Sequence, residues 1–199
     1  MGETKRCGSA ERNTRETSVK VELCLDGTGE RDIDTGIGFL DHMMVLLAEH
    51  GNFDITCKAT GDLHVDAHHT TEDIGLALGM AFSEAVGDKK GIARYGTVRL
   101  PMQESLVTVS LDLSGRPFLA YDVNFQSAKV GDFDVELVEE FFQAFTSTSH
   151  VTMHIDQERG WNAHHLAEAV FKAAARALRA AVSKNPGTGD RVPSSKGVL

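Results

Sequence analysis

The pentad His-His-X-X-Glu occurs twice, at His68–Glu72 and at His164–Glu168, each time just before a long apolar helical pattern. Residues three or four positions apart share one face of a helix. Within each pentad the second histidine and the glutamate could therefore chelate one ion, pairing His69 with Glu72 and His165 with Glu168. The first histidine points about 100° away and is better placed for a different ion. The repeat predicts a duplicated element that touches two metal ions, and hence a metalloenzyme.

Composition narrows the class of protein. The chain of 199 residues is 41% hydrophobic and 25% charged, which is ordinary for a globular protein with a substantial core. Its formal net charge of −9 disfavours binding to nucleic acids or anionic membranes. No apolar run approaches the roughly 20 residues of a membrane helix, and the N-terminus does not read as a secretory signal. We therefore expect a cytoplasmic protein with no nucleic-acid and no membrane partner.

The cysteines give no sign of a redox or structural motif. Cys7, Cys24 and Cys57 are odd in number and form no CxxC pair. This usage fits a reducing compartment, so we expect three free thiols that are buried or incidental.

The chain also divides into two related halves. Glu16–Gly27 aligns with Glu104–Gly115 at a constant offset of 88 residues. Apolar residues alternate in both segments, which predicts half-buried strands. Each segment ends in turn residues, at 26–29 and at 114–117, which predict a hairpin into a second strand.

A helical pattern follows in each half, with apolar stripes at 39–47 and 137–145. Gly51 is a plausible C-terminal stop for the first of these helices. Further strand segments at 53–65 and 151–155 lead to the two pentads and their helices. The last helix is expected from about Ala163 to Val182, with Asn162 as its N-cap. Because the pentads lie 96 residues apart, the second half contains eight extra residues.

Six sequence motifs resemble those of one family. They are GIGFLDHM from Gly36 to Met43, DAHHTTED, GIARYG, LSGRP, NAHHLAEAVFKA and the terminal PSSKGVL. In this order, over about residues 12–199, they closely resemble the imidazoleglycerol-phosphate dehydratases. The resemblance implies a hydro-lyase of L-histidine biosynthesis that converts D-erythro-imidazoleglycerol 3-phosphate to imidazoleacetol phosphate and water. Gln103 and His150 depart from the family pattern, where an acidic and a small residue are usual, and put fine tuning rather than the reaction in doubt.

The resemblance also implies the fold. We expect an internally duplicated α+β chain with two pseudo-symmetric halves, each a four-stranded sheet packed with two helices, similar to ribosomal protein S5 domain 2. The first half is assigned to residues 12–88, the second to 97–183, and the polar segment Asp88–Gly96 to the connection. Residues 1–12 and 184–199 lack periodicity and should be mobile unless something holds them. The tail at 184–199 is expected to close over the substrate phosphate.

The resemblance adds two metal ligands to the pentads, His42 in LDHM and His154 in TMHI. Eight candidates then supply four ligands to each of two Mn²⁺ ions per active site: His42, His68, His69, Glu72, His154, His164, His165 and Glu168. One ion should take His42, His69 and Glu72 together with His164 from another copy, and the second the mirrored set. Active sites should therefore lie between subunits of a homo-oligomer, a 24-mer by resemblance. His64 and His150 are left as structural.

Two metal ions would suit this reaction. The substrate must lose a hydroxyl beside its imidazole and a proton from the next carbon, which is not acidic. Ions on both ring nitrogens would favour an imidazolate, which can expel the hydroxyl to give a diazafulvene-like intermediate and so acidify that proton. By resemblance Glu16, in RETSV, is the catalytic glutamate. His50, at the end of the first helix, is a candidate contact to the diol hydroxyls. A solvated carboxylate and a partner for the helix dipole are the structural alternatives for these two residues.

A phosphate needs a local group of cations in an otherwise acidic protein. Arginine offers bidentate hydrogen bonds to a phosphate, and lysine a point charge. By resemblance the phosphate-binding residues are Arg94, Arg116, Lys172, Ser194, Ser195 and Lys196.

Two other classes of function were weighed against a dehydratase. A metal-bridged structural or storage cage would use the pentads without catalysis, but it would not need the cationic residues or the SSKG tail. A ribosomal-protein-like RNA binder is disfavoured by the negative charge and the lack of a basic stripe with stacking aromatics. No glycine-rich dinucleotide or P-loop pattern indicates a nucleotide cofactor.

Overall fold

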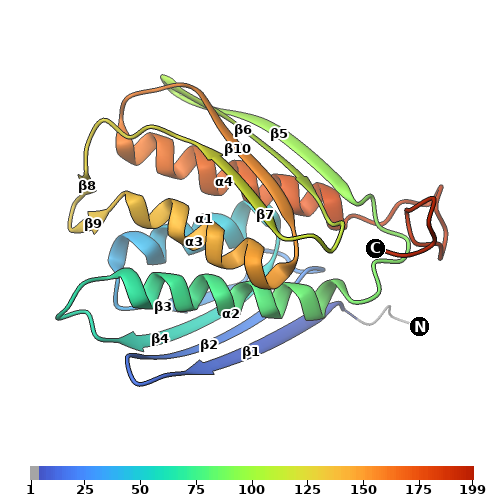
Figure 1. Ribbon diagram of the computed structural model, residues 1–199, viewed down its shortest axis with the longest axis horizontal. Coiled ribbons are helices and arrows are strands. Elements are labelled where there is room, and N and C mark those ends of the chain that lie inside the picture. The colour runs from blue at the N-terminus through green and yellow to red at the C-terminus, as the bar shows by residue number, and fades with distance from the viewer. Residues whose placement is uncertain (1–4) are drawn as a thin grey trace.

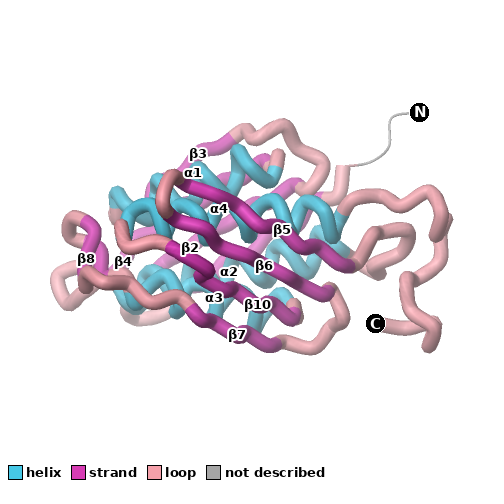
Figure 2. The backbone as a smooth tube through the Cα atoms, turned by 90° about the horizontal axis from the view of Figure 1, so that it is seen from above, coloured by secondary structure: helices cyan, strands magenta, loops and turns pink. Residues whose placement is uncertain are grey.

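The computed structural model describes residues 5–199 and has an α+β architecture, in which helices lie between two four-stranded sheets (Figure 1). The first sheet has the order β1 (Cys7–Asn13), β2 (Thr17–Cys24), β4 (Asp54–Gly61) and β3 (Arg31–Asp34), with α1 (Gly38–Gly51) and α2 (His68–Val86). The second has the order β5 (Tyr95–Met102), β6 (Ser105–Asp112), β10 (Thr152–Arg159) and β7 (Phe118–Asp122), with α3 (Glu136–Ser149) and α4 (Ala163–Val182). The two halves have the same topology, as the internal repeat predicted. Figure 2 looks onto the second sheet, with the helices behind it.

The alternating strands bury one face, as their pattern predicted. Val19 and Val21 of β2, and Val107 and Val109 of β6, are all at most 1% exposed. The halves join through two helix pairs, because α2 packs on α3 and α1 packs on α4. Small residues bring α4 close to the second sheet: a Cβ atom at Gly96 of β5 would collide with the backbone of α4. The pentads at the starts of α2 and α4 are thus fixed on rigid helices.

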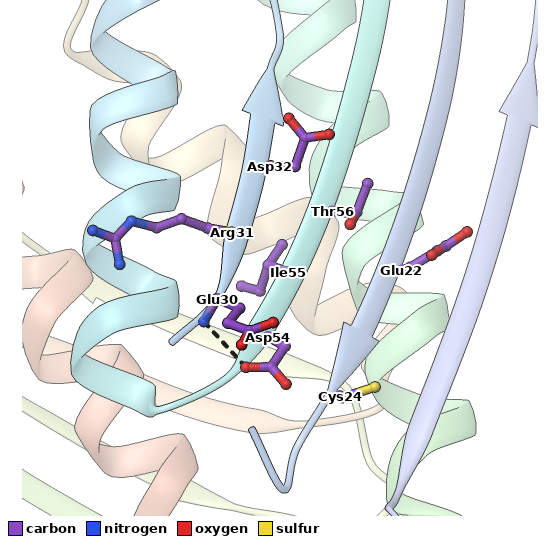
Figure 3. A pocket seen from close by; sticks show the side chains of 8 residues that line it. All are labelled: Glu22, Cys24, Glu30, Arg31, Asp32, Asp54, Ile55 and Thr56. Carbon is purple, nitrogen blue, oxygen red and sulfur yellow. Dashed lines mark hydrogen bonds between the residues drawn. The ribbon is translucent and has the colours of Figure 1, made fainter. Parts of the chain in front are cut away.

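The hairpins predicted at residues 26–29 and 114–117 are both wrong. β3 does not pair with β2 but runs parallel to β4 at the far edge of the sheet, and β7 runs parallel to β10 in the same way. The Asp54 carboxylate accepts hydrogen bonds from the backbone N–H groups of Thr28 (2.8 Å) and Glu30 (3.1 Å; Figure 3). These bonds hold the turn against the start of β4, so that the chain crosses from the β2 edge of β4 to its opposite edge. Glycine is required at position 27, since a Cβ atom there would overlap Asp54.

The N-terminal segment also differs from the sequence prediction. Residues 7–11, expected outside the first half, form most of the edge strand β1. Cys7 and Cys24 face each other on the antiparallel strands β1 and β2 and form a disulfide, which leaves Cys57 as the free, buried cysteine of the described chain. The expectation of three free thiols is therefore wrong. Adjacent strands bring two cysteines together without a CxxC motif, which a linear pattern does not reveal.

Further local differences have clear causes. Gly51, the predicted stop, is the last residue of α1, and the left-handed residue that caps the helix is Asn52 (φ 49°), because asparagine also tolerates that conformation. The second half carries a small added hairpin, β8 (Lys129–Val130) with β9 (Phe133–Asp134), between β7 and α3. Asn162 caps α4 as predicted, accepting from the backbone N–H groups of His164 and His165. None of the described helices is long and apolar enough to cross a membrane.

Candidate active site

The first candidate ligand cluster joins α1 to α4. The Nε2 atoms of His42 and His164 lie 2.7 Å and 3.1 Å from the same carboxylate oxygen, Oε1 of Glu168. Burial opposes ionisation of Glu168, but hydrogen bonds from Lys172, His42 and His164 outweigh it and lower its pKa to about 2. Two imidazoles and an ionised carboxylate therefore converge, which is the arrangement that a divalent ion needs.

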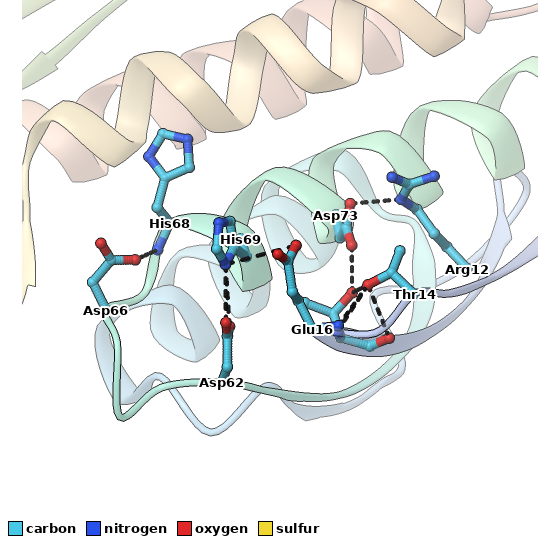
Figure 4. A network of polar contacts seen from close by, with 9 residues as sticks. Arg12, Thr14, Glu16, Asp62, Asp66, His68, His69 and Asp73 are labelled. Carbon is cyan, nitrogen blue, oxygen red and sulfur yellow. Dashed lines mark hydrogen bonds and ion pairs between the residues drawn. The ribbon is translucent and has the colours of Figure 1, made fainter.

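The second cluster joins α2 to α3. His68, Glu72 and Glu140 each bring one ligand atom to within 4.8 Å of the others. In Figure 4 the His68 ring points toward α3 and away from its neighbour His69. Glu140 was not among the predicted ligands, because no motif links it to a histidine and only the packing of α3 against α2 brings it here.

The grouping of ligands within one chain differs from the predicted one. Each pentad contributes its first histidine and its glutamate to a cluster, not its second histidine. Residues four apart are offset by about 40° around a helix, against about 60° for residues three apart, so the wider spacing aligns the pair more closely. His42 accordingly shares a cluster with His164 and Glu168, rather than with His69 and Glu72.

The second histidine of each pentad pairs with a carboxylate outside the clusters. The Nδ1 atom of His69 lies 3.0 Å from Asp62, and that of His165 lies 2.9 Å from Glu104. The hydrogen bond that His69 donates to Asp62 raises the pKa of His69, and the one that His165 donates to Glu104 lowers the pKa of Glu104 to about 2. Glu16, in the turn between β1 and β2, lies near the same ring, with 3.9 Å between its Oε2 and Nδ1 of His69 (Figure 4).

Five of the six predicted phosphate-binding residues line one cavity of about 400 Å³. They are Arg94, Arg116, Ser194, Ser195 and Lys196. Arg94 donates hydrogen bonds to the Asp112 carboxylate through Nε (2.7 Å) and Nη2 (3.1 Å), and its Nη1 donates to the backbone carbonyl of Pro193 (2.8 Å). The guanidinium therefore tethers the C-terminal tail beside the cavity, and two of its five N–H donors remain for an anion.

The clusters and this cavity lie at opposite ends of one chain. His42 and His164 line a groove that also includes residues 129–134 of the β8–β9 hairpin. The cavity lies at the other end of α4, where the N–H of Arg94 donates to the carbonyl of Ala181 (2.8 Å). His164 and Ala181 are separated by roughly 25 Å along the helix, at about 1.5 Å per residue. Figure 1 shows the tail at the end of the molecule opposite to β8 and β9.

Comparison with known proteins agrees with this architecture. The family model for imidazoleglycerol-phosphate dehydratase matches residues 35–178. The imidazoleglycerol-phosphate dehydratase of Methylorubrum extorquens is 56% identical over 194 residues, which are 98% of this chain and 100% of the relative. The chain belongs to the imidazoleglycerol-phosphate dehydratase family.

Other members of the imidazoleglycerol-phosphate dehydratase family match over similar lengths. The dehydratase of Ruegeria pomeroyi is 55% identical over 98% of this chain and 100% of its own. The crystal structure from Staphylococcus aureus has a TM-score of 0.82 and 41% identity, covering 90% of this chain and 99% of that chain. The structure from Pyrococcus furiosus, in complex with (S)-C348, has a TM-score of 0.83 and 39% identity, covering 96% and 100%. The likeness thus covers both halves.

The donor atoms of the two ligand clusters are suited to divalent metal ions. Each cluster offers imidazole nitrogen and carboxylate oxygen and no thiolate, a set that suits Mn, Fe, Zn or Co. The donors of the first cluster already converge on one oxygen, so little rearrangement is needed to receive an ion.

The structure separates Lys172 and His154 from their predicted partners. Lys172 is not in the phosphate cavity; its Nζ donates to Glu168 (2.6 Å), and it lines a groove with His50 and Arg176. Burial lowers the pKa of His50, and the charges of Lys172 and Arg176 lower it further. His154 lies exposed on β10, with its ring 5.8 Å from that of Phe118, and belongs to neither cluster of the described chain.

The two departures from the family pattern both occupy left-handed backbone positions. Gln103 has φ 53° in the two-residue turn between β5 and β6, and His150 has φ 56° at the end of α3. A small residue is favoured at such a position, which accounts for the family preference at 150. His64 lies in the loop after β4 rather than on a strand, so its likeness to the segment around His154 is not structural.

Proposed function

We propose that the chain dehydrates imidazoleglycerol phosphate to imidazoleacetol phosphate, as a hydro-lyase of L-histidine biosynthesis, at active sites assembled from more than one copy. The observation that carries the proposal is the combination of two nitrogen–oxygen ligand clusters at one end of the chain with a cationic cavity at the other. A metalloenzyme acting on a phosphorylated substrate needs both.

Two Mn²⁺ ions per site are the proposed cofactors. His42, His164 and Glu168 would hold one ion, and His68, Glu72 and Glu140 the other. Bound ions would supply Lewis-acid stabilisation of the imidazole ring and a template that orients the substrate.

Proton transfer is assigned to two residues beside the ligand clusters. The Glu16 carboxylate is 57% exposed, and its nearest charged partner is His69 at 3.9 Å, so it is free to accept the proton on the carbon next to the departing hydroxyl. His50 has a lowered pKa and stays neutral near pH 7, when it can donate to or accept from the diol hydroxyls.

The substrate phosphate is assigned to the cavity at the other end of the chain. Arg94 and Arg116 offer forked donors, and Lys196 with Ser194 and Ser195 adds further donors from the tail. The tether from Arg94 to Pro193 would let the tail close over bound phosphate and exclude water. Lys172 is no longer assigned to the phosphate, because it lies at the metal end of the chain and pairs with the Glu168 carboxylate.

The separation of the two ends supports an oligomer. A substrate with three carbons between its ring and its phosphate cannot span the roughly 25 Å between them. One copy would therefore supply the clusters and another the phosphate cavity. By family resemblance we propose a 24-mer, manganese as the ion and the cytoplasm as the location.

The proposal is tested by a dehydration assay on the chelated protein and again after Mn²⁺ is restored. We expect activity to disappear and to return. Glu16→Gln should keep its metal and its assembly but lose most turnover. A protein that binds Mn²⁺ yet turns over no substrate would instead favour the metal-bridged structural or storage cage.

A further inference from the structure

The second histidine of each pentad has the same ring atom engaged by a carboxylate, but the two carboxylates come from different places. Nδ1 of His69 lies 3.0 Å and 3.3 Å from the two oxygens of Asp62, just after β4 (Figure 4). Nδ1 of His165 lies 2.9 Å from Glu104, in the turn between β5 and β6. Neither histidine belongs to a ligand cluster of its own chain, within the part that the structure describes.

A carboxylate in this position decides which ring nitrogen can bind a metal. A neutral imidazole carries one proton, and a carboxylate acceptor draws that proton to Nδ1. The lone pair is then on Nε2, and the hydrogen bond also fixes the plane of the ring. His69 and His165 are thereby prepared as Nε2 ligands that point away from their carboxylates.

The two carboxylates are not counterparts in the internal repeat. Glu104 corresponds to Glu16, 88 residues earlier, yet Glu16 stands 3.9 Å from its histidine while Glu104 is hydrogen-bonded. The counterpart of Asp62 is Trp161, because the two residues follow equivalent glycines. A Cβ atom added at Gly61 would approach Thr17, the residue after Glu16. One added at Gly160 would approach Ser105, the residue after Glu104. Tryptophan cannot accept a hydrogen bond. In the first half, Asp62 therefore accepts the histidine hydrogen bond that Glu104 accepts in the second half.

Both carboxylates are held firmly. The side chains of Asp62 and Glu104 are only 17% and 16% exposed. Oε1 of Glu104 also accepts the backbone N–H of Asn162 (3.2 Å), the residue that caps α4. The His165 ring is thus fixed relative to the helix that carries it.

We propose that Asp62 and Glu104 are positioning residues, which fix His69 and His165 as Nε2 ligands for ions held in the clusters of a neighbouring copy. Because Asp62 takes this task in the first half, Glu16 remains free for proton transfer. The inference rests on the proposed function, since it needs metal-bridged copies.

The test measures Mn²⁺ affinity by chelator competition in the full-length protein. Asp62→Asn and Glu104→Gln should each bind Mn²⁺ about 10- to 100-fold more weakly, the usual effect of removing a carboxylate behind a histidine ligand. Asp88→Asn is the matched control, because Asp88 lies beyond the far end of α2, where it pairs with Lys90 (2.7 Å), and the substitution should leave the affinity unchanged. Wild-type affinity in both test variants would overturn the inference, whereas a wild-type protein that binds no Mn²⁺ would overturn the proposed function with it.

A double-mutant cycle separates positioning from a general structural effect. If Asp62 acts through His69, Asp62→Asn should have no further effect on Mn²⁺ affinity in a His69→Gln background. Additive losses would refute positioning. At saturating Mn²⁺, Asp62→Asn should recover less of its kcat than Glu104→Gln does, because the unpaired His69 ring would draw Glu16 to itself. Equal recovery of both variants would refute the claim that Asp62 frees Glu16.

Discussion

Arg94→Lys should separate the role of Arg94 in binding phosphate from its role in the fold, because the chain contains a matched arginine. Arg6 lies 88 residues before Arg94 and makes the same three contacts. It donates hydrogen bonds to the Asp26 carboxylate through Nε (2.9 Å) and Nη2 (2.6 Å), and its Nη1 donates to the carbonyl of Val182 (2.7 Å). Its side chain is 15% exposed, against 13% for Arg94. The two arginines differ in that only Arg94 lines the phosphate cavity.

The expected magnitudes follow from these contacts. A lysine keeps the charge but cannot reach the carboxylate twice and the carbonyl at once. Hydrogen bonds to charged groups each contribute about 1.5–3 kcal/mol, so both Arg94→Lys and Arg6→Lys should lose about that much unfolding free energy. Losing the forked contact to the substrate phosphate costs a similar amount, which is a roughly 10- to 150-fold rise in KM. The rise should be confined to Arg94→Lys.

Two assays decide the outcome. Urea unfolding should give similar losses for both variants, and steady-state kinetics should show a raised KM with little change in kcat, because the phosphate is remote from the reacting carbons. An equal rise of KM in Arg6→Lys would show that the effect comes from lost stability. An unchanged KM in Arg94→Lys would remove Arg94 from phosphate binding.

Three further predictions concern the metal end and the cysteines. Glu140→Gln should weaken Mn²⁺ binding in chelator competition while Glu139→Gln, an exposed neighbour on α3, should not; equal affinities would remove Glu140 from the ligands. In the metal-free protein Glu168 has a pKa of about 2 against a usual 4.5, so its stabilisation is complete above pH 4.5 and is lost as the pH falls toward 2. Over that range, the unfolding free energy of the wild type should fall by about 3 kcal/mol more than that of Glu168→Gln, at about 1.36 kcal/mol per pKa unit, and parallel losses would contradict this cause. Under non-reducing conditions one thiol per chain, Cys57, should react with iodoacetamide, and only after unfolding, because burial raises its pKa to about 12; three reactive thiols would contradict the disulfide.

The periodic features of the chain were predictable from the sequence. The alternation in β2 and β6, the helical stripes and the cap at Asn162 depend on neighbours along the chain, and all are present. The order of strands was not predictable in this way. The side of β4 on which β3 lies depends on Asp54, which is more than twenty residues from the turn that it organises.

The site shows the same division. The pentads were readable, because helical spacing is local, and the tail and arginine motifs led to one cavity. Glu140 was missed, since only the packing of α3 against α2 brings it to His68. Asp62 was missed, since an irregular loop separates it from His69 and the spacing rules of helices and strands do not apply there. Glu104 could have been found, because the repeat aligned it with Glu16 and so placed a carboxylate at the same point of the second half.

The placement of the two ligand clusters and the phosphate cavity at opposite ends of the chain has a genetic consequence. A chain damaged only at its metal end still carries a sound phosphate end, and the reverse holds for a chain damaged at the tail. In an assembly of both kinds, some sites would receive one sound end from each. Two alleles that are inactive alone, such as Glu168→Gln and Arg116→Ala, should therefore complement each other when they are expressed in the same cell.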